Sequence, residues 1–468
     1  DSMSGSFNEM DVPPTLVSFA LSMTEASKTG TAAFQKKDSL VAFLPLPVDD
    51  KTLLPDFAKA KELYDEVTRL VQFGVVNAAS VVCEGGVAAT VARMSFGNRI
   101  GFAFNGEVDR QTLFAPLAGS IVLELKEGDL CLEGLDYTLI GSTIEEEEIV
   151  LAGETLPLDD LIRVWTAPLN PVFPINSKAE PTMTPEVKLW AQRNDHAPAI
   201  HTARPRVFIP VFPGTNCEYD TARAFERAGA VADTLVVKNL TPAGIEETIQ
   251  RMEASIRNAQ IVMLPGGFSG GDEPDGSGKF IATTLRNPRL AEAINDLLQN
   301  RDGLMLGICN GFQALIKLGL VPYGEIRPLA EDAPTLTFNT LGRHISRMVY
   351  TRISSVKSPW LAGCEAGDVH CIPVSHGEGR FVANAAVMQQ LVENGQIATQ
   401  YVTPDGVPVP ETTWNPNGSV CAVEGITSPD GRVFGKMGHS ERCGDDLLRN
   451  VPGNKDQKLF ESGVRYFR

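Results

Sequence analysis

The feature that most constrains this chain is the alternation of apolar runs with amphipathic segments after Arg204. The runs "RVFIPVF", "AQIVMLPGG" and "GLMLGIC" each have strand length, and segments such as "CEYDTARAFERAGA" and "PRLAEAINDLLQN" lie between them. Strands that are apolar throughout, alternating with helices, are typical of βαβ units in a parallel sheet covered on both faces. We therefore predict a doubly wound, flavodoxin-like α/β sheet in this half of the chain.

The upstream part follows a different pattern. The segment from Leu53, "LLPDFAKAKELYDEVTRLVQFG", has Leu63, Val67 and Leu70 at helical spacing, and Asp56 is a suitable N-cap. The next segment, "VVNAASVVCEGGVAATVARMSF", reads as a strand, a glycine turn and a helix. We predict three parts: a mixed α+β domain over residues 1–174, a polar linker over 175–203 with a helix in "TPEVKLWAQRN", and the α/β domain over 204–468.

Composition limits the classes of protein. The net charge of −17 argues against nucleic-acid binding, and no apolar run reaches the length of a membrane span. The eight cysteines show neither zinc-ligand nor disulfide spacing, which favours a reducing, cytoplasmic location. The chain opens without Met and without the pattern of a signal peptide, so we expect a fragment of a longer protein.

Cys309 lies where a predicted strand meets a predicted helix, in "LGICNGFQAL". A strand–nucleophile–helix turn exposes the side chain at the carboxyl edge of the sheet and directs helix N–H groups toward it. Gly307 and Gly311 flank the cysteine, and small neighbours allow the strained turn. Cys309 is therefore a candidate nucleophile, although a buried cysteine at a strand end would give the same pattern.

A thiol nucleophile needs a base and a group that orients the base. His439 and Glu441 follow the strand-like "VFGKM" and are two residues apart, so in extended backbone they point to the same side. A surface histidine near an acid is the simpler interpretation. His376, in the glycine-rich "VSHGEGRF", is the other contender, but a structural or binding role suits it better.

Acyl transfer also requires donors for an oxyanion. The glycine-rich "MLPGGFSGGD" follows another predicted strand, and the N–H groups of Gly267 and Asn310 could converge on one oxygen. Without a matching cysteine, "PGG" would read as a tight turn.

Three of these motifs, "LPGGFSGGD", "GICNGFQAL" and "GHSER", resemble in order the class I, triad-type glutamine amidotransferases. The resemblance implies that Cys309 is the nucleophile, His439 the general base and Glu441 the residue that orients it. It also implies that Gly267 and Asn310 form the oxyanion hole, and that Gln313 and Phe268 bind glutamine.

Longer stretches, including "FPGTNCEYDTARAFERAGA" and, upstream, "EGGVAATVARMSFGNRIGF", resemble the formylglycinamide ribonucleotide amidotransferase family. That resemblance implies synthesis of formylglycinamidine ribonucleotide in purine biosynthesis, with glutamine, formylglycinamide ribonucleotide and ATP as substrates and Mg²⁺ as cofactor. It makes residues 1–174 part of a synthetase-like domain whose N-terminal half is missing. Asp1, Ser2 and Ser4 would contact phosphate or Mg²⁺, unless this segment is only a solvated terminus.

Two positions depart from the family pattern. Ser440 stands where many relatives have proline, and Glu84 stands where many have aspartate.

A further group of residues is expected to connect the two activities. Arg343 and His344, in "FNTLGRHISRM", are predicted to line the path of ammonia or to contact glutamine, with a surface strand as the alternative. His376, Glu378 and Arg380 are predicted to lie at the domain interface.

Three other functions stay open at this point. A thiol hydrolase of the same architecture would share the cysteine, histidine and glutamate, but Gln313 and a synthetase-like domain argue against it. A non-catalytic fragment would bind partners and turn nothing over. An amidotransferase with a different acceptor is disfavoured by the first 175 residues.

Overall fold

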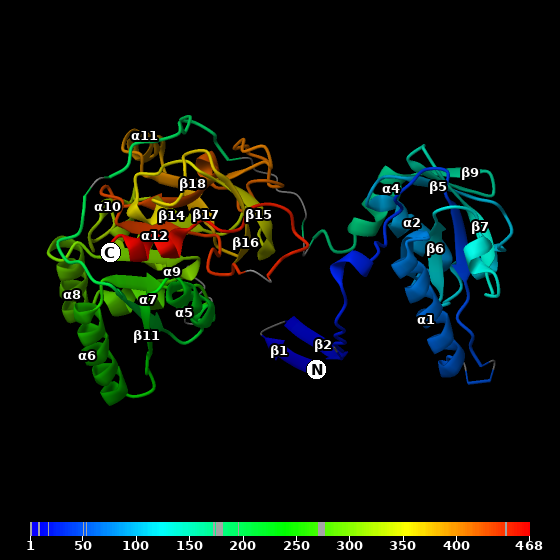
Figure 1. The fold of residues 1–468 in the computed structure, drawn as a ribbon, viewed down its shortest axis with the longest axis horizontal. Coiled ribbons are helices and arrows are strands. Elements are labelled where there is room, and N and C mark those ends of the chain that lie inside the picture. Colours follow the sequence, from blue (N-terminus) through cyan, green and yellow to red (C-terminus); the bar gives the residue numbers. More distant parts are fainter. Residues whose placement is uncertain are drawn as a thin grey trace. The chain divides into compact units, whose positions relative to one another are not determined.

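The computed structural model describes residues 2–7, 10–16, 18–49, 51–52, 54–171, 174, 181–194, 196–269, 277–444 and 447–468. The chain divides into two compact units, Asp1–Pro171 and Val172–Arg468, and Figure 1 shows the elements of each. Both units combine sheets with helices, and the second contains the predicted parallel strands, so the α/β fold class is confirmed.

The first unit is built on a seven-stranded, mostly antiparallel sheet with helices packed against it. In sheet order its strands are β4 (Val76–Val81), β6 (Ile121–Leu125), β3 (Leu40–Leu44), β7 (Thr138–Ile144), β5 (Gly101–Phe104), β8 (Glu148–Leu151) and β9 (Glu154–Pro157). Its helices are η1 (Ala26–Lys28), α1 (Phe57–Phe73), α2 (Gly86–Phe96), α3 (Arg110–Phe114), η2 (Leu130–Leu132) and α4 (Leu158–Thr166). A separate antiparallel hairpin joins β1 (Ser2–Phe7) and β2 (Met10–Leu16).

Alternation along the strands gives this sheet two cores. On β3, Val41 and Phe43 belong to the core that includes α2 and α4, whereas Ala42 and Leu44 belong to the core that includes α1. The predicted cap of α1 is confirmed, because the side chain of Asp56 accepts hydrogen bonds from the N–H groups of Ala58 and Lys59. Leu63, Val67 and Leu70 are buried, as the helical spacing predicts.

The second unit is built on a nine-stranded sheet. In order its strands are β11 (Val231–Val236), β10 (Arg206–Val211), β12 (Ile261–Leu264), β13 (Leu304–Ile308), β20 (Val433–Lys436), β19 (Val423–Thr427), β18 (Ile397–Val402), β15 (Ile345–Ile353) and β16 (Val369–His376). The first five are parallel, and from β20 onward the neighbours are antiparallel. A small antiparallel pair joins β14 (Thr335–Thr337) and β17 (Arg380–Val382).

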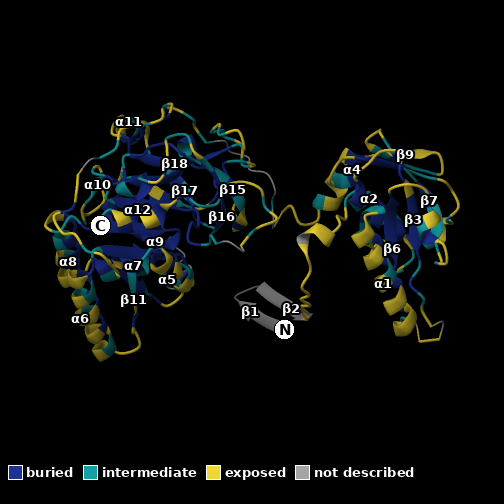
Figure 2. Cartoon of the chain, viewed as in Figure 1, coloured by how far each residue is buried: buried dark blue, intermediate teal, exposed yellow. Residues whose placement is uncertain are grey.

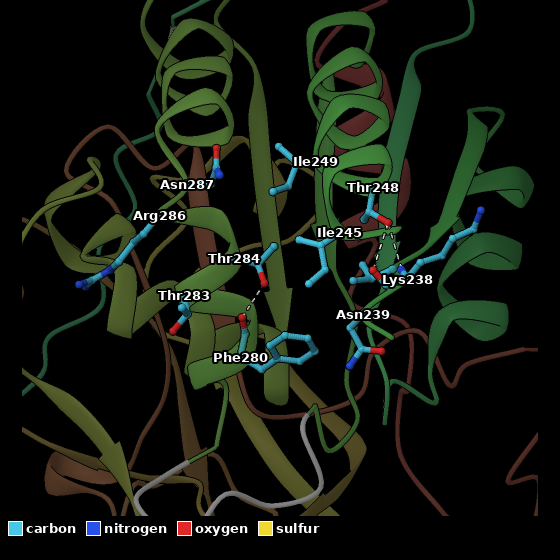
Figure 3. A pocket seen from close by; sticks show the side chains of 11 residues that line it. Lys238, Asn239, Ile245, Thr248, Ile249, Phe280, Thr283, Thr284, Arg286 and Asn287 are labelled. Atoms are coloured by element: carbon cyan, nitrogen blue, oxygen red, sulfur yellow. Dashed lines mark hydrogen bonds between the residues drawn. The ribbon is translucent and has the colours of Figure 1, made fainter. Parts of the chain in front are cut away.

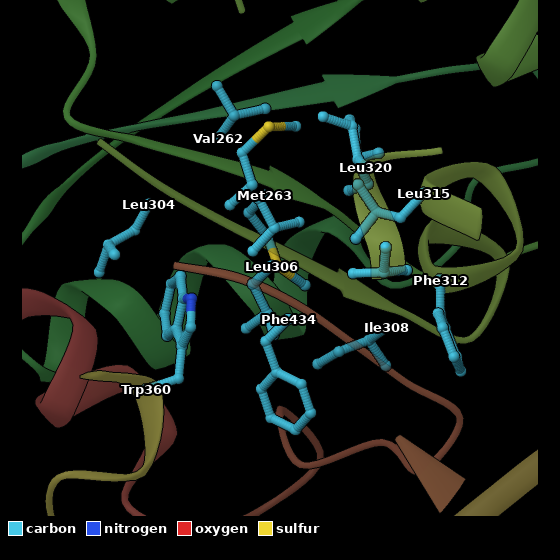
Figure 4. Close-up of a cluster of buried hydrophobic side chains, with 14 of the residues drawn as sticks. Val262, Met263, Leu304, Leu306, Ile308, Phe312, Leu315, Leu320, Trp360 and Phe434 are labelled. Carbon is cyan, nitrogen blue, oxygen red and sulfur yellow. The ribbon is translucent and has the colours of Figure 1, made fainter. Parts of the chain in front are cut away.

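Helices cover this sheet. They are α5 (Glu218–Arg227), α6 (Pro242–Asn258), α7 (Lys279–Leu285), α8 (Pro288–Gln299), α9 (Asn310–Leu318), α10 (Leu320–Tyr323), η3 (Pro359–Leu361), α11 (Ala385–Glu393), η4 (Val420–Ala422) and α12 (Leu459–Arg465). Every residue of β12 and β13 is buried, which is why these strands are apolar throughout. Figure 2 shows the buried strands beneath helices with exposed outer faces, and Figure 4 shows side chains of β12 and β13 packed with Phe312, Trp360 and Phe434.

Two local expectations in this unit need comment. The sequence "LTPAGIEETIQRMEAS" predicts a helix with Thr241 as N-cap and Pro242 as its first residue. This is confirmed in α6, because Thr241 Oγ1 accepts a hydrogen bond from the N–H of Gly244. The helix predicted within "TPEVKLWAQRN" is wrong: Trp190 instead forms a parallel bridge with Ser355, and its N–H donates to the carbonyl of Ser354 at 2.8 Å. Backbone pairing with the larger domain has overridden the local preference for a helix.

None of the helices in the described part of the chain combines the length and the apolar character that crossing a bilayer requires.

Candidate active site

The site begins with two adjacent parallel strands. β13 pairs with β20 in the register Ile308↔Lys436, so both strands end at the same edge of the sheet. Cys309 follows β13 directly, and His439 lies in the loop that follows β20. The carboxyl edge of a parallel sheet is where such folds place their functional groups. The topology thus brings together two residues that are far apart in sequence.

Cys309 has a strained backbone, with φ 53° and ψ −107° at the N-cap of α9. A non-glycine residue with positive φ is uncommon and marks a constrained position. The flanking glycines permit the turn: a Cβ on Gly311 would lie 1.9 Å from the carbonyl oxygen of Leu264, and one on Gly307 would lie 2.6 Å from Leu315 Cδ1. The G-x-C-x-G sequence is therefore a packing requirement of this strand-to-helix turn.

His439 and Glu441 form a buried pair. Nδ1 of His439 lies 2.7 Å from Oε1 of Glu441, and both side chains are almost fully buried. Burial alone would lower the pKa of His439, but the carboxylate of Glu441 and the nearby thiols outweigh it and raise the pKa well above its ordinary value. Burial opposes ionisation of Glu441 as well, yet the imidazole holds the pKa of this carboxyl below its ordinary value. The pair therefore favours a protonated imidazole beside a carboxylate.

The other edge of the imidazole faces Cys309 across a glycine. A Cβ on Gly266 would lie 2.7 Å from Cε1 of His439 and 3.4 Å from Cβ of Cys309. Gly266 thus leaves open the space in which the thiol and the ring approach one another. Nε2 of His439 has no hydrogen-bond partner among the described residues, and the Cys309 thiol contributes to the raised pKa of His439.

A second cysteine, Cys217, belongs to this cluster and was not predicted. Its Sγ lies 3.8 Å from Nδ1 of His439 and accepts a hydrogen bond from the guanidinium of Arg442 at 3.1 Å. Cys217 lies after the loop that follows β10, at the N-cap of α5, so a search for cysteines at the starts of predicted helices could have found it. Cys217, His439 and Glu441 each offer one ligand atom within 4.8 Å of the others, but the cation of Arg442 opposes a metal ion there.

The predicted oxyanion and glutamine-binding residues surround the same strand ends. Gly267 forms a bridge with Thr215, and Asn310 is the first residue of α9, whose opening N–H groups have no intrahelical partner. Oδ1 of Asn310 accepts a hydrogen bond from the N–H of Ser269 at 3.2 Å, which ties the two loops together. Gln313 accepts from the Asn310 side chain at 3.0 Å and donates to the carbonyl of Glu378 at 2.6 Å.

Phe268 and His344 lie close to each other, with ring centroids 6.0 Å apart. Nε2 of His344 lies 3.1 Å from the side-chain hydroxyl of Ser375. The backbone carbonyl oxygen of Ser375 lies 3.6 Å from Sγ of Cys309. Arg343 is directed elsewhere, since its Nε donates to the carbonyl of Pro174 at 2.7 Å. Of the residues predicted for an ammonia path, His344 is therefore connected to the cysteine and Arg343 to the segment that precedes the domain.

The residues predicted for a domain interface are enclosed within the second unit to differing degrees. His376 ends β16, and burial lowers its pKa to about 3, so its ring is neutral. Both ring nitrogens lack hydrogen-bond partners among the described residues. Glu378 is also buried and accepts from the N–H of Ser277 at 2.8 Å, while Arg380 is half-buried at the start of β17.

The structure describes none of the side chains that are predicted to contact phosphate or Mg²⁺. Asp1 lies outside the described residues, and Ser2 and Ser4 belong to β1 with side chains that are not described. Over the part of the chain that the structure describes, the one candidate ligand cluster is Cys217, His439 and Glu441. Mg²⁺ prefers oxygen ligands, so this sulfur- and nitrogen-containing set does not suit it.

A separate cavity of about 340 Å³ lies beside α6, α7 and the start of α8 (Figure 3). It is lined by none of the predicted site residues. The hydroxyl of Thr284 donates to the carbonyl of Phe280, and that of Thr248 accepts from the N–H of Lys238. Both hydroxyls form hydrogen bonds with backbone groups. We therefore locate the candidate active site at the ends of β13 and β20.

Comparison with known proteins is consistent with this location. Residues 204–467 match the family of CobB/CobQ-like glutamine amidotransferase domains. A phosphoribosylformylglycinamidine synthase subunit PurQ from Aquifex aeolicus is 35% identical over 247 residues, covering 52% of this chain and 94% of the relative. The PurQ subunit of Symbiobacterium thermophilum is 35% identical over 264 residues, covering 56% and 96%.

Solved structures also match. The structure of PurLQS from Thermotoga maritima covers 57% of this chain and 100% of the matched chain, with 27% identity and a TM-score of 0.41. The Thermotoga maritima PurL complexed with ATP covers 29% of this chain and 27% of its own, with 14% identity and a TM-score of 0.25.

Proposed function

Because the chain belongs to the family of CobB/CobQ-like glutamine amidotransferase domains, we propose that Cys309, His439 and Glu441 hydrolyse glutamine and release ammonia. The observation that carries this proposal is the buried His439–Glu441 pair, whose ring lies with Cys309 around Gly266 and whose Nε2 has no partner among the described residues. Cys309 itself stands in a strained turn. These are the three groups that thiol-dependent acyl transfer needs.

In the proposed reaction, Sγ of Cys309 attacks the side-chain amide carbon of glutamine. The N–H groups of Gly267 and Asn310 are assigned to the resulting oxyanion. His439 then gives its proton to the departing nitrogen, ammonia leaves, and a γ-glutamyl thioester remains on Cys309. A water molecule, deprotonated by His439, attacks the thioester and releases glutamate. Glu441 stabilises the imidazolium and fixes the orientation of the ring.

We assign glutamine recognition to Gln313 and Phe268, and a role near the ammonia path to His344. The side chain of Gln313 already bridges Asn310 and Glu378, so it would exchange a hydrogen bond when it contacts glutamine. His376 and Glu378 support this side of the site, and Arg343 and Arg380 are assigned to its border with the preceding segment.

The proposal for the ammonia acceptor is supported by the names of the relatives. They are subunits of phosphoribosylformylglycinamidine synthase, so we propose that this chain supplies ammonia for the ATP- and Mg²⁺-dependent conversion of formylglycinamide ribonucleotide in the cytoplasm. Residues 1–174 are assigned to the synthetase side, completed by a partner segment, and residues 175–203 to the connection. ATP and Mg²⁺ would bind chiefly outside the glutaminase domain, with Asp1, Ser2 and Ser4 as candidate contacts.

The decisive experiment measures glutamate and ammonia from glutamine with the wild-type chain, with Cys309→Ala and with Cys421→Ala. Cys421 is a buried cysteine at η4 and serves as the matched control. We expect Cys309→Ala to lose all detectable hydrolysis, whereas Cys421→Ala keeps it. Hydrolysis that persists in Cys309→Ala would refute the assignment of the nucleophile.

The acceptor is tested by adding ATP, Mg²⁺ and formylglycinamide ribonucleotide together with the partner synthetase segment. We expect ADP to form only when all substrates are present, and glutamate to form in at least the same amount. Glutamine hydrolysis that never couples to ADP formation under these conditions would refute the acceptor while leaving the glutaminase assignment standing.

A further inference from the structure

A fully buried ion pair lies directly behind the loop that carries His439. Nζ of Lys436, the last residue of β20, lies 3.2 Å from Oε1 of Glu424 on the neighbouring strand β19, and both side chains are 0% exposed. Removing two charges from water is costly, and such a pair is not in itself a strong source of stability. Its presence beside the site therefore calls for another explanation.

Three hydrogen bonds of the pair go to the two residues that flank His439. On the N-terminal side, Oε1 of Glu424 accepts from the N–H of Gly438 at 2.6 Å, and Lys436 donates to the carbonyl of Gly438 at 2.8 Å. On the C-terminal side, Lys436 donates to the hydroxyl of Ser440 at 2.9 Å. The three N–H groups of the ammonium thus have three acceptors, and two of these acceptors belong to the loop.

Three further hydrogen bonds anchor this network to the sheet. The hydroxyl of Ser440 donates to Oε1 of Gln457 at 2.5 Å, and Nε2 of Gln457 donates to Thr351 Oγ1 on β15 at 3.2 Å. On the other side, Thr399 of β18 donates to the carboxylate of Glu424. The loop is therefore connected to four strands by buried hydrogen bonds, several of which involve a charged group and are stronger for that reason.

Close packing also restricts the backbone conformation of the loop that carries His439. A Cβ on Gly438 would lie 2.2 Å from Ile372 Cδ1 and 2.9 Å from Oε1 of Glu424. The N–H of His439 itself donates to the carbonyl of Pro373 at 2.9 Å. The loop is thus held against β16 by packing and against β19 and β20 by the ion pair.

We propose that Lys436, Glu424 and Ser440 form a positioning clamp, which fixes the backbone on both sides of His439 and so holds the imidazole and Glu441 in line with Cys309. This proposal rests on the proposed glutaminase function. It also assigns a role to Ser440: a proline at this position would have no hydroxyl, so Lys436 would lose one acceptor and Gln457 one donor. The hydroxyl of Ser440 thus connects the loop to the ammonium group of Lys436 on β20.

The test uses the full chain and single and double substitutions. Ser440→Ala removes the hydroxyl, and Ser440→Thr keeps it. Lys436→Met and Glu424→Gln each disrupt the ion pair, whereas the double variant Lys436→Met/Glu424→Gln removes both charges without leaving one unpaired in the core. Each protein is assayed for glutamine hydrolysis from pH 5 to about 9, for thermal unfolding, and for the rate at which iodoacetamide alkylates Cys309, identified by peptide mapping.

For a clamp, we expect Ser440→Ala to lower kcat about tenfold with KM changed by less than about twofold, because a misplaced base costs rate more than binding. Ser440→Thr should restore most of kcat. The double variant should recover the thermal stability lost by Lys436→Met but not its kcat. Two other titratable groups face the pair, since His370 senses the charge of Lys436 and Tyr401 that of Glu424. The pH profile is therefore read in Ser440→Ala, which leaves both charges in place.

Other outcomes would overturn the proposed clamp. If Ser440→Ala matches the wild type in kcat and pH profile, or if the double variant regains kcat together with stability, the pair only supports the fold and the proposal is overturned. If the wild-type chain hydrolyses no glutamine, the proposed function fails, and the clamp is then judged by alkylation alone. An alkylation rate and pH profile unchanged in Ser440→Ala would refute it, whereas a change reversed in Ser440→Thr would support it.

Discussion

At the scale of single residues, the candidate site depends on groups whose properties are set by burial and by one neighbour each. The ring of His439 is held by Glu441, and the turn of Cys309 is permitted by Gly307 and Gly311. The sequence was sufficient to propose Cys309, His439 and Glu441, because each lies just past a recognisable strand. It was not sufficient to place Arg442 against Cys217, since that contact depends on how two distant loops meet.

Replacing Glu441 by Gln should reduce glutamine hydrolysis by about 10²- to 10⁴-fold in kcat, as expected when the group that orients a catalytic imidazole is neutralised. Without the carboxylate, burial dominates, so the pKa of His439 falls and the ring loses its proton at lower pH. The measurement is the pH dependence of kcat/KM for glutamine. Glu365→Gln, at an exposed carboxylate paired with Arg193, is the control and should behave as wild type. Equal activity of Glu441→Gln would contradict the pairing.

His376 should make the second unit sensitive to acid. Its folded-state pKa is depressed to about 3 by burial, so its contribution to stability is present above the ordinary histidine pKa of about 6.5 and is lost as pH falls toward 3. The loss approaches about 1.4 kcal/mol per pH unit within this window. We expect His376→Gln to unfold at lower pH than the wild type, as followed by circular dichroism.

The control for this experiment is His201→Gln, because His201 is exposed. An acid-unfolding midpoint that moves equally in both variants would show that burial of His376 is not the cause.

At the scale of elements, the hydrophobic pattern of the sequence predicted most of the parallel strands in the sheet of the second unit. β10, β12 and β13 match continuous apolar runs, and α6 begins at its predicted cap. The strand-like run that contains β20 was also recognised, but its place between β13 and β19 could not be predicted in this way, because long-range pairing decides it. The wrong helix around Trp190 has the same origin, since an edge contact with Ser355 outweighs local propensity.

The contact between β20 and α9 gives a prediction at this scale. A Cβ on Gly435 would lie 2.1 Å from Cδ2 of Phe312, a fully buried ring of α9. Gly435→Ala should therefore lower the free energy of unfolding by about 1–3 kcal/mol, the usual cost of overpacking a core. It should also reduce glutaminase activity, because β20 carries the loop of His439.

Gly377→Ala is the matched control for Gly435→Ala. A Cβ at Gly377 meets nothing within 4 Å, so this substitution should leave unfolding almost unchanged. Equal denaturation midpoints for the two variants would contradict the close contact between β20 and Phe312.

At the scale of the whole molecule, the two units have separate cores: two clusters on the sheet of the first unit, and a large and a small cluster in the second. Such an arrangement is expected to unfold in more than one cooperative step. Scanning calorimetry should resolve two transitions, and Gly435→Ala should lower the temperature of only one of them. A single transition that moves as a whole would show that the units unfold together.

The place of β20 also has a consequence during synthesis of the chain. β13 ends at Ile308, whereas β20, which pairs with it, begins only at Val433. On the proposed function, a polypeptide that stops before Val433 would carry Cys309 without His439 and Glu441, and we expect it to leave glutamine intact. Synthesis of β20 and of the loop after it would thus be a condition for the first turnover.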